Sequence, residues 1–400
     1  MGLLRCGLCN PMKLLMVRHD CLGLNRRVCL PLHSFTSRHG IRYSSSAVRP
    51  VFLSLLEDND FLGSKTLLID NVGSHSYFQI LEQSFHLYLR LKKDFNIRKG
   101  ARVAYLCPNN ISYTIVQWAA WMAGCIAVPL CSSHPPAQLK YYIQNSTPAV
   151  VIGTNDFYDS LQPLCDAENL RSIWLQFNPL TRTYVQSGRN FIPENRSFFS
   201  ALYRAYSLSW KQTDWEKHDA LLIYTSGTTD QPKGVLMTHG NIHAQIQNMT
   251  EAWQWSEDDV LLHVLPLHHV HGVTNCLATC LNSAATCVML PRFDAQQVWE
   301  KLTSEQSPVI NLFMAVPTIY AKLIEYYNHN YKSPRVQEFI RSVCKENIRL
   351  MVSGSAALPT PIMEKWEEIT GHVLLERYGM TEIGMALTNP LHGERVADKL

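Results

Sequence analysis

The chain has 400 residues, of which 46% are hydrophobic and 17% are charged, and its net charge at pH 7 is +3. This length is too great for one small core and indicates two or three packed units. The slight charge, without a basic stripe interleaved with aromatic residues, argues against a nucleic-acid partner. No window approaches 18 uninterrupted apolar residues, so we expect no membrane span.

Residues 1–49 have the composition of a mitochondrial transit peptide. Eight lysines and arginines stand against a single acidic residue, Asp20, and three serines occupy positions 44–46. Arginine-rich, acid-poor segments with serine are typical of mitochondrial import, and the arginines interrupt every apolar stretch that would serve as a secretory signal. A disordered basic tail is the alternative. We expect a leader at 1–49 and a protein of the mitochondrial matrix.

The 12 cysteines are scattered along the chain. Cys6 and Cys9 form a C-x-x-C pair inside the expected leader. The other cysteines have the character of small core residues or of free thiols in a reducing compartment, so we expect no disulfides.

Strand-like and helix-like segments alternate up to about residue 152. The strand-like segments are 102–106, 126–128 and 149–152, and the helical ones are 110–123 and 135–145. A β-α-β-α-β series predicts a parallel sheet. Residues 157–218 contain turn residues and aromatics without a clear period. We take 50–210 as a first α/β subdomain.

Residues 224–234, with the sequence YTSGTTDQPKG, have the composition of a phosphate-binding loop. The contributing residues are Thr225, Ser226, Gly227, Thr228, Thr229, Lys233 and Gly234. Glycines let a phosphate approach the backbone, hydroxyls donate hydrogen bonds, and Lys233 supplies a mobile positive charge. An ordinary Gly/Thr-rich turn would need neither four hydroxyls nor the lysine. The spacing is not that of a P-loop, and short apolar runs on both sides predict that the loop joins two strands.

The alternation of strands and helices resumes after this loop. The strand-like segments are 261–265, 286–290, 309–313 and 348–352, and a helix is expected at 317–327 with proline in its first turn. These elements predict a second α/β subdomain at 211–390, followed by a short tail at 391–400.

Three short motifs each follow a predicted strand. They are LPLHHVHG at 265–272, SGSA at 353–356 and RYGMTE at 377–382. Open α/β sheets bind their ligands at the carboxyl ends of the strands. The motifs are therefore placed where a ligand would bind.

Together with the hydroxyl loop, these motifs resemble those of the adenylate-forming superfamily, the acyl-CoA synthetases, over about residues 50–390. The resemblance implies the large N-terminal region of such an enzyme, with two packed α/β subdomains and mostly parallel sheets. It also implies ATP and Mg²⁺ as cofactors and CoA as a co-substrate. A carboxylate would attack the α-phosphate of ATP, and the CoA thiol would then displace AMP from the acyl-adenylate.

The resemblance also assigns roles to individual residues. The hydroxyl loop and its Lys233 would hold the β- and γ-phosphates. The adenine would lie among Ser355, Ala356, Tyr378 and Gly379. Thr381 would reach the α-phosphate, and Glu382 would hold Mg²⁺, a hard cation suited to carboxylate oxygen. Thr381, Glu382 and Lys233 are thus the expected catalytic residues. Asp230 stands where the family usually has glycine, and it brings a negative charge beside the triphosphate.

The motifs are most similar to those of family members that activate malonate or methylmalonate. By resemblance His269 walls the acyl pocket, and Val270 and Met380 set its size. The second carboxylate of malonate stays ionised and needs a cation or several donors. Arg349, shortly before the SGSA motif, is one candidate for that cation, and Lys322 is another. A medium-chain or aromatic acid would need an apolar pocket without a cation, and a non-catalytic nucleotide-binding protein is a further alternative.

The histidines of the first motif also allow a zinc site. His268, His269 and His271 lie near Cys276 and Cys280 in the sequence. The match to zinc-ligand spacing is loose, and the two cysteines, four residues apart, fit better on one apolar helix face.

The family continues beyond the last of these motifs with a C-terminal lid domain. That domain carries the lysine that stabilises charge on the attacked α-phosphate, and it rotates to build the CoA tunnel. The 400 residues end before it, and Lys399 has nothing to position it. We therefore expect little or no malonyl-CoA synthesis from this chain by itself.

Overall fold

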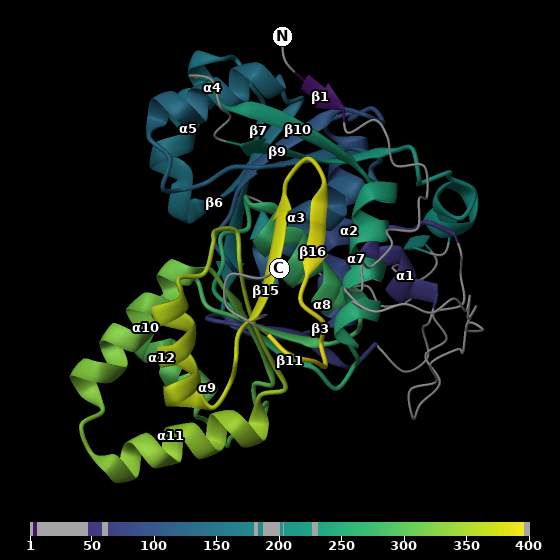
Figure 1. Ribbon diagram of the computed structural model, residues 1–400. Helices are drawn as coiled ribbons and strands as arrows, with labels where there is room; N and C mark the ends of the chain where they lie inside the picture. The colour runs from purple at the N-terminus through teal and green to yellow at the C-terminus, as the bar shows by residue number, and fades with distance from the viewer. Residues whose placement is uncertain are drawn as a thin grey trace.

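The computed structural model describes residues 3–5, 47–57, 63–179, 183–186, 201–202, 204–225 and 231–395. Its framework is a pair of eight-stranded sheets with helices packed against them (Figure 1). The α/β class expected from the sequence is confirmed. Most of the expected leader lies outside the described residues, so the leader stays a prediction.

The first sheet has the strand order β1-β10-β9-β5-β4-β6-β7-β8. Its strands are β1 (Leu3–Arg5), β4 (Arg102–Leu106), β5 (Ile126–Pro129), β6 (Val150–Thr154), β7 (Ser172–Asn178), β8 (Thr183–Gln186), β9 (Asp219–Thr225) and β10 (Lys233–Thr238). β4 pairs in parallel with β5 and with β6, as the β-α-β-α-β pattern predicted. These three strands are buried nearly throughout, which explains why their sequences are continuous apolar runs rather than alternating ones.

The helices of the first half of the chain join and cover these strands. They are α1 (Val51–Glu57), α2 (Tyr77–Lys93), α3 (Ile111–Met122), α4 (Pro136–Ser146), the 3-10 turn η1 (Asn155–Phe157), α5 (Tyr158–Ala167) and the π-helical turn η2 (Tyr206–Trp210). Every residue of α3 is buried. Trp121 Nε1 donates to the carbonyl of Ala220 in β9 at 2.8 Å. On the same helix the Tyr113 hydroxyl donates at 2.8 Å to the carbonyl of Leu267, beyond the second sheet's β11. α3 therefore ties the two sheets together.

The second sheet has the strand order β16-β15-β14-β13-β11-β12-β2-β3. Its strands are β2 (Thr66–Asp70), β3 (Gly73–Ser76), β11 (Val260–His263), β12 (Thr286–Met289), β13 (Leu312–Ala315), β14 (Leu350–Gly354), β15 (Leu375–Met380) and β16 (Gly384–Thr388). The strands from β2 to β15 in this order pair in parallel, and only the edge strands β3 and β16 are antiparallel to their neighbours. The carboxyl ends of the central strands therefore meet at one edge.

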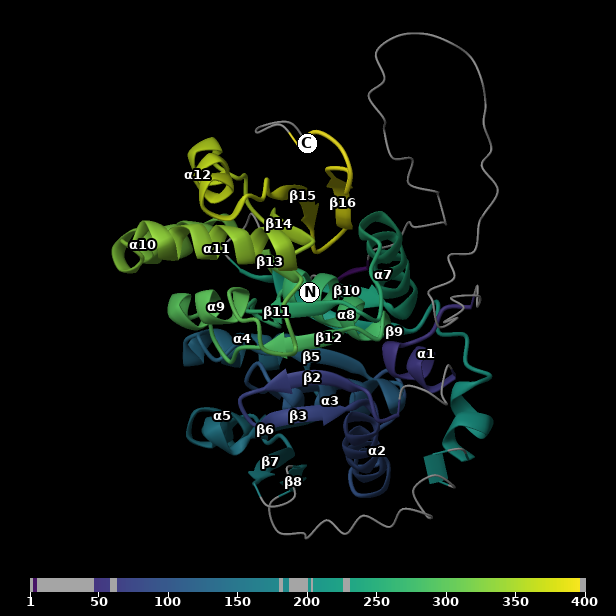
Figure 2. The same cartoon turned by 90° about the horizontal axis from the view of Figure 1, so that it is seen from below.

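The remaining helices lie around this second sheet. They are α7 (His239–Trp253), the π-helical segment η3 (His271–Ala278), α8 (Thr279–Asn282), α9 (Ala295–Leu302), α10 (Pro317–Asn330), α11 (Pro334–Asn347) and α12 (Thr360–Thr370). Figures 1 and 2 show α9 to α12 grouped on one side of the molecule, away from α7. None of the described helices is long and apolar enough to cross a membrane.

From the sequence we expected one α/β subdomain before about residue 210 and another after it. The two sheets are not divided at that residue, because each takes strands from both parts of the chain. Strands β2 and β3 come from the first part of the chain but complete the second sheet, beside β12. Strands β9 and β10 come from the second part but belong to the first sheet, beside β5. Periodicity predicts where a strand lies in the sequence but not which strand it pairs with, and parallel pairing allows long connections.

Candidate functional site

The hydroxyl of Ser355 joins the three motifs that follow the strands. His271 Nδ1 lies 3.0 Å from Ser355 Oγ, and Arg377 Nη2 donates to the same oxygen at 3.1 Å. These residues come from the segment after β11, from the end of β14 and from β15. Ser355 has a backbone φ of +70°, an uncommon conformation for a residue with a side chain and one that often marks functional positions. Segments distant in the sequence thus meet in one cluster.

Arg377 is the buried cation of this cluster. Its exposed fraction is 4%, and its Nε has no hydrogen-bond partner among the described residues. Burial lowers the pKa of Arg377 to about 10, so the guanidinium still carries its charge at pH 7. No carboxylate of the described residues forms an ion pair with it. Since a buried charge is costly without a counter-ion, this guanidinium is a candidate to bind an anion.

Two glycines permit the close packing of this cluster. A Cβ atom on Gly354 would lie 2.4 Å from Arg377 Nε, so only glycine leaves room for the guanidinium. A Cβ atom on Gly272 would lie 2.2 Å from the carbonyl oxygen of Pro266, which explains why the H-x-x-G turn ends in glycine. The glycines of two of the motifs are therefore required by geometry.

The buried histidines of the cluster are neutral at pH 7. Burial lowers the pKa of His271 well below its usual range, and the charge of Arg377 lowers it further. Burial likewise lowers the pKa of His263 to about 4. Neutral His263 must carry its proton on Nε2, which lies 3.1 Å from the carbonyl oxygen of Gly272 and must donate to it. Arg377 therefore supplies the positive charge of the cluster.

The hydroxyl loop joins two strands, as the sequence predicted. It connects β9 to β10, which pair antiparallel with Thr225 opposite Lys233 and Tyr224 opposite Gly234. Thr225 Oγ1 donates weakly to the carbonyl of Lys233 at 3.5 Å. Ser226, Gly227, Thr228 and Thr229, together with Asp230, lie outside the described residues. The structure thus shows the two ends of the loop.

The β15–β16 hairpin holds the residues assigned to adenine, the α-phosphate and Mg²⁺. Tyr378, Gly379 and Met380 lie in β15, and Thr381 and Glu382 lie in the turn that follows. Tyr378 is 50% exposed and Met380 is 46% exposed, so both have apolar surface open to contact. Ser355 and Ala356, also assigned to adenine, are exposed after β14.

Helix α7 connects the two hairpins of the site. It follows β10 directly, and Thr238 caps its first turn by accepting from Asn241 N at 3.1 Å. Further along the helix, Gln245 Oε1 accepts from Met385 N of β16 at 2.6 Å. Helix α7 thus follows the β9–β10 hairpin in the chain and is hydrogen-bonded to the β15–β16 hairpin.

The expectation that Arg349 faces the acyl pocket is wrong. Arg349 lies just before the first residue of β14. The site lies beyond the last residue of that strand, so the five residues of β14 separate the two. Its Nε and Nη2 atoms donate to the two carboxylate oxygens of Asp259, each at 2.6 Å. Nη1 donates at 2.9 Å to the carbonyl of Trp253. Arg349 is therefore a structural ion-pair residue at the opposite edge of the sheet. Arg377 is the first residue of the RYGMTE motif, but the sequence pattern does not show that its side chain is buried.

The zinc set considered from the sequence does not assemble. Cys276 is buried with its Sγ 3.7 Å from Met314 Sδ, and Cys280 is buried next to Cys287. Burial raises the pKa of Cys280 well above its usual range, so the thiol stays protonated. The two residues are core cysteines. His269 and Val270, assigned to the acyl pocket, lie in the turn just before η3.

The chain is similar to curated malonate–CoA ligases. The mitochondrial malonate–CoA ligase ACSF3 of Xenopus laevis is 45% identical over 370 residues, which cover 92% of this chain and 61% of the relative. That of Bos taurus is 47% identical over 371 residues, with 92% and 58% covered. The human protein is 46% identical over 346 residues, with 86% and 56% covered. The chain thus spans about six-tenths of the length of these relatives.

Solved structures share the fold of this chain. ATP-bound MatB from Rhodopseudomonas palustris has a TM-score of 0.68 and 25% identity, over 87% of this chain and 63% of MatB. A malonyl-CoA ligase with bound methylmalonyl-CoA and AMP has a TM-score of 0.65 and 26% identity, over 84% of this chain and 62% of its own. The family model described as AMP-binding enzyme matches residues 59–399. The chain belongs to the AMP-binding enzymes, the adenylate-forming family that its motifs resemble.

Proposed function

We propose that this chain forms the nucleotide- and acid-binding region of a malonate–CoA ligase. In this reaction ATP converts malonate into malonyl-adenylate with release of pyrophosphate, and CoA then displaces AMP to give malonyl-CoA. The support from known proteins is the similarity to three malonate–CoA ligases and to a ligase structure that holds methylmalonyl-CoA and AMP. The observation that carries the choice of acid is the buried Arg377, which no described carboxylate neutralises.

The chemistry of malonate fits that arginine. Activation uses one carboxylate and leaves the other ionised, and burying a lone carboxylate costs several kcal/mol. A buried guanidinium forms charge-assisted hydrogen bonds with the carboxylate. These bonds offset the desolvation cost of the carboxylate and that of the guanidinium. Ser355 and His271 add polar groups beside it. A medium-chain monocarboxylic acid would instead leave Arg377 buried without an anion. Arg377 therefore takes the role first expected of Arg349.

The nucleotide part of the proposal rests on the β9–β10 and β15–β16 hairpins, both of which adjoin α7. Lys233, at the start of β10, would meet the β- and γ-phosphates with the hydroxyls of the preceding loop, and Thr381 would orient the α-phosphate. Glu382, half-buried in the β15–β16 turn, suits Mg²⁺ as a carboxylate ligand. Mg²⁺ is usually held by one or two carboxylates together with substrate phosphates, and it would neutralise their charge. The exposed face of Tyr378 would pack against adenine, beside Ser355, Ala356 and Gly379.

The proposed location is the mitochondrial matrix. The leader composition of residues 1–49 supports it, as do the three relatives, which are mitochondrial proteins by name. Malonate, ATP and CoA are the proposed small-molecule partners.

The test is equilibrium binding of malonate and of butyrate, measured by calorimetry with a non-hydrolysable ATP analogue present. Arg377→Met should weaken malonate binding by about 1.5–3 kcal/mol, the usual value of a charged hydrogen bond, and should change butyrate binding little. Arg349→Met is the matched control, and it should leave both affinities unchanged. Equal losses for the two acids in the Arg377 variant would remove this arginine from the pocket.

A further inference from the structure

A short turn after β5 brings a thiol and an imidazole together. Its sequence is Cys131-Ser132-Ser133-His134, and the backbone N–H of His134 donates to the carbonyl of Cys131 at 3.2 Å. This hydrogen bond brings the first and last residues of the C-x-x-H sequence together. The side chains of Cys131 and His134 therefore start from neighbouring points of the backbone. Cys131 is buried, and its Sγ lies 3.0 Å from Ser133 Oγ. The turn thus presents two possible metal ligands.

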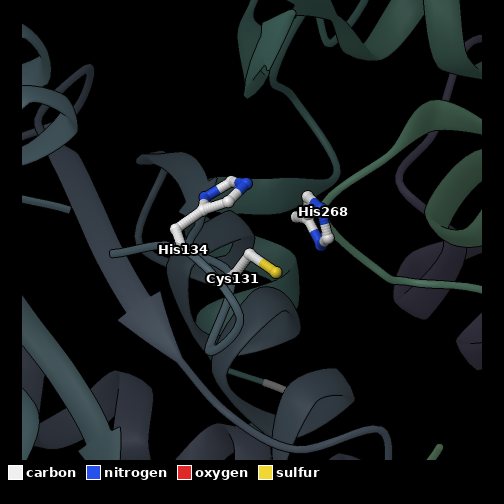
Figure 3. A group of neighbouring side chains, drawn as sticks. All are labelled: Cys131, His134 and His268. Carbon is white, nitrogen blue, oxygen red and sulfur yellow. The ribbon is translucent and has the colours of Figure 1, made fainter. Parts of the chain in front are cut away.

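A third ligand comes from the other sheet. His268 lies in the segment that follows β11, and its ring centroid is 5.2 Å from that of His134. One ligand atom each from Cys131, His134 and His268 can be chosen so that all three lie within 4.8 Å of one another. Figure 3 shows His268 facing the two residues of the turn across the space between the segments. In addition, Nδ1 of His134 is buried and has no hydrogen-bond partner among the described residues.

We propose that Cys131, His134 and His268 bind one Zn²⁺ ion between the two sheets. Around a tetrahedral Zn²⁺ with zinc–sulfur and zinc–nitrogen bonds of about 2.3 and 2.1 Å, the ligand atoms lie about 3.4–3.6 Å apart, whereas these three atoms lie within 4.8 Å of one another. Rotations of the three side chains close this difference of up to about 1.4 Å. The fourth tetrahedral position is left for water or another small ligand.

The donor set selects zinc over the magnesium that accompanies ATP. One thiolate and two imidazoles suit Zn²⁺, whereas Mg²⁺ requires oxygen ligands. The site is separate from Glu382 and does not depend on the proposed ligase reaction. The site does adjoin His269 of the LPLHHVHG motif, the residue assigned to the acyl pocket, since the ring centroids of His268 and His269 are 4.1 Å apart. A bound ion would link, through metal–ligand bonds, the turn after β5 in the first sheet to the segment after β11 in the second.

The test is titration of the full chain with Zn²⁺ and with Co²⁺, in the presence of excess Mg²⁺. We expect one high-affinity Zn²⁺ per chain by competition with a chromophoric chelator. Co²⁺ should give the near-ultraviolet charge-transfer band of a thiolate ligand together with the intense visible bands of tetrahedral coordination. Cys131→Ser should abolish the charge-transfer band, and His134→Gln and His268→Gln should each weaken binding at least tenfold, with folding checked by circular dichroism.

The control variants separate this site from other cysteines and histidines. The double variant Cys6→Ser/Cys9→Ser removes the C-x-x-C of the expected leader, and His329→Gln removes an exposed histidine on α10. Both should retain the high-affinity site. The proposal is overturned if no high-affinity Zn²⁺ is bound, if binding survives unchanged in the variants of His134 and His268, or if it disappears with Cys6 and Cys9. His134→Gln alters a side chain of a surface turn, so it keeps the test decisive even where Cys131→Ser does not fold.

Discussion

Replacing Arg349 by methionine should destabilise the fold without affecting the acyl pocket. The guanidinium forms a two-pronged ion pair with Asp259, whose side chain is only 2% exposed. Without Arg349 that carboxylate would keep a hydrogen bond from Ser256 N, at 2.8 Å, but would lose its cation. The variant therefore leaves a nearly buried charge without its partner.

The size of the effect follows from the burial of the pair. Removing one partner of a buried ion pair costs about 3–5 kcal/mol. The arginine side chain is 30% exposed, and water reaching it weakens the interaction, so we expect a loss of about 2–3 kcal/mol in the free energy of unfolding. Urea unfolding followed by circular dichroism measures this loss. Malonate affinity should stay within experimental error of the parent chain.

A double-mutant cycle identifies Asp259 as the cause. Asp259→Asn removes the charge that Arg349 neutralises, so adding Arg349→Met to it should cost less than Arg349→Met alone costs the parent. The reasoning is refuted if the two losses are simply additive. It is also refuted if Arg349→Met leaves stability unchanged and weakens malonate binding.

Further outcomes follow from the site, the buried histidines and the leader. Lys233→Ala should weaken ATP binding by about 1.5–3 kcal/mol in calorimetry, and an unchanged affinity would contradict the phosphate-loop assignment. Burial lowers the pKa of His263 from 6.5 to about 4, so the unfolded chain takes up a proton below pH 6.5 that the folded chain does not. The free energy of unfolding should therefore fall by up to about 1.4 kcal/mol per pH unit for this histidine between pH 6.5 and about 4. His263→Gln should flatten that slope in urea unfolding, and an identical slope would show that other groups cause it. Residues 1–50 fused to a fluorescent reporter should direct it to mitochondria, and a diffuse signal would argue against the leader.

Local sequence patterns were sufficient to predict most central strands and the type of loop at the phosphate site. The expected strand at 102–106 is β4, and the helix expected at 317–327 begins at Pro317 in α10. These segments are long runs of apolar or periodic residues, which a strand or helix needs wherever it lies. The segment 157–218 gave no such signal, although it contains α5, β7 and β8. Helix α5 includes Pro163, a residue that argues against a helix in the sequence, and it buries only two of its residues.

The error over Arg349 has a geometric cause. A residue before a parallel strand and a residue after it are close in sequence, but the five strand residues between them put them about 20 Å apart. Arg377 lies at the correct edge, yet arginine in a motif is usually exposed, and its burial depends on packing against Gly354 and Ser355. Pairing between distant strands and the burial of a charge are both properties of the whole fold.

The placement of β2 in the second sheet constrains the order of events during synthesis. Thr286, at the start of β12, donates its hydroxyl to the carbonyl of Thr66 in β2 at 2.9 Å, although 220 residues separate them. At about 5–20 residues per second, a ribosome needs roughly 10–45 s to make the intervening chain. During that time the fully buried side chains of Leu67 and Leu68 have no strand β12 to pack beside. The emerging chain therefore carries β2 without its β12 neighbour while more than half of the 400 residues are made, and an unpaired apolar strand edge of this kind is prone to aggregation.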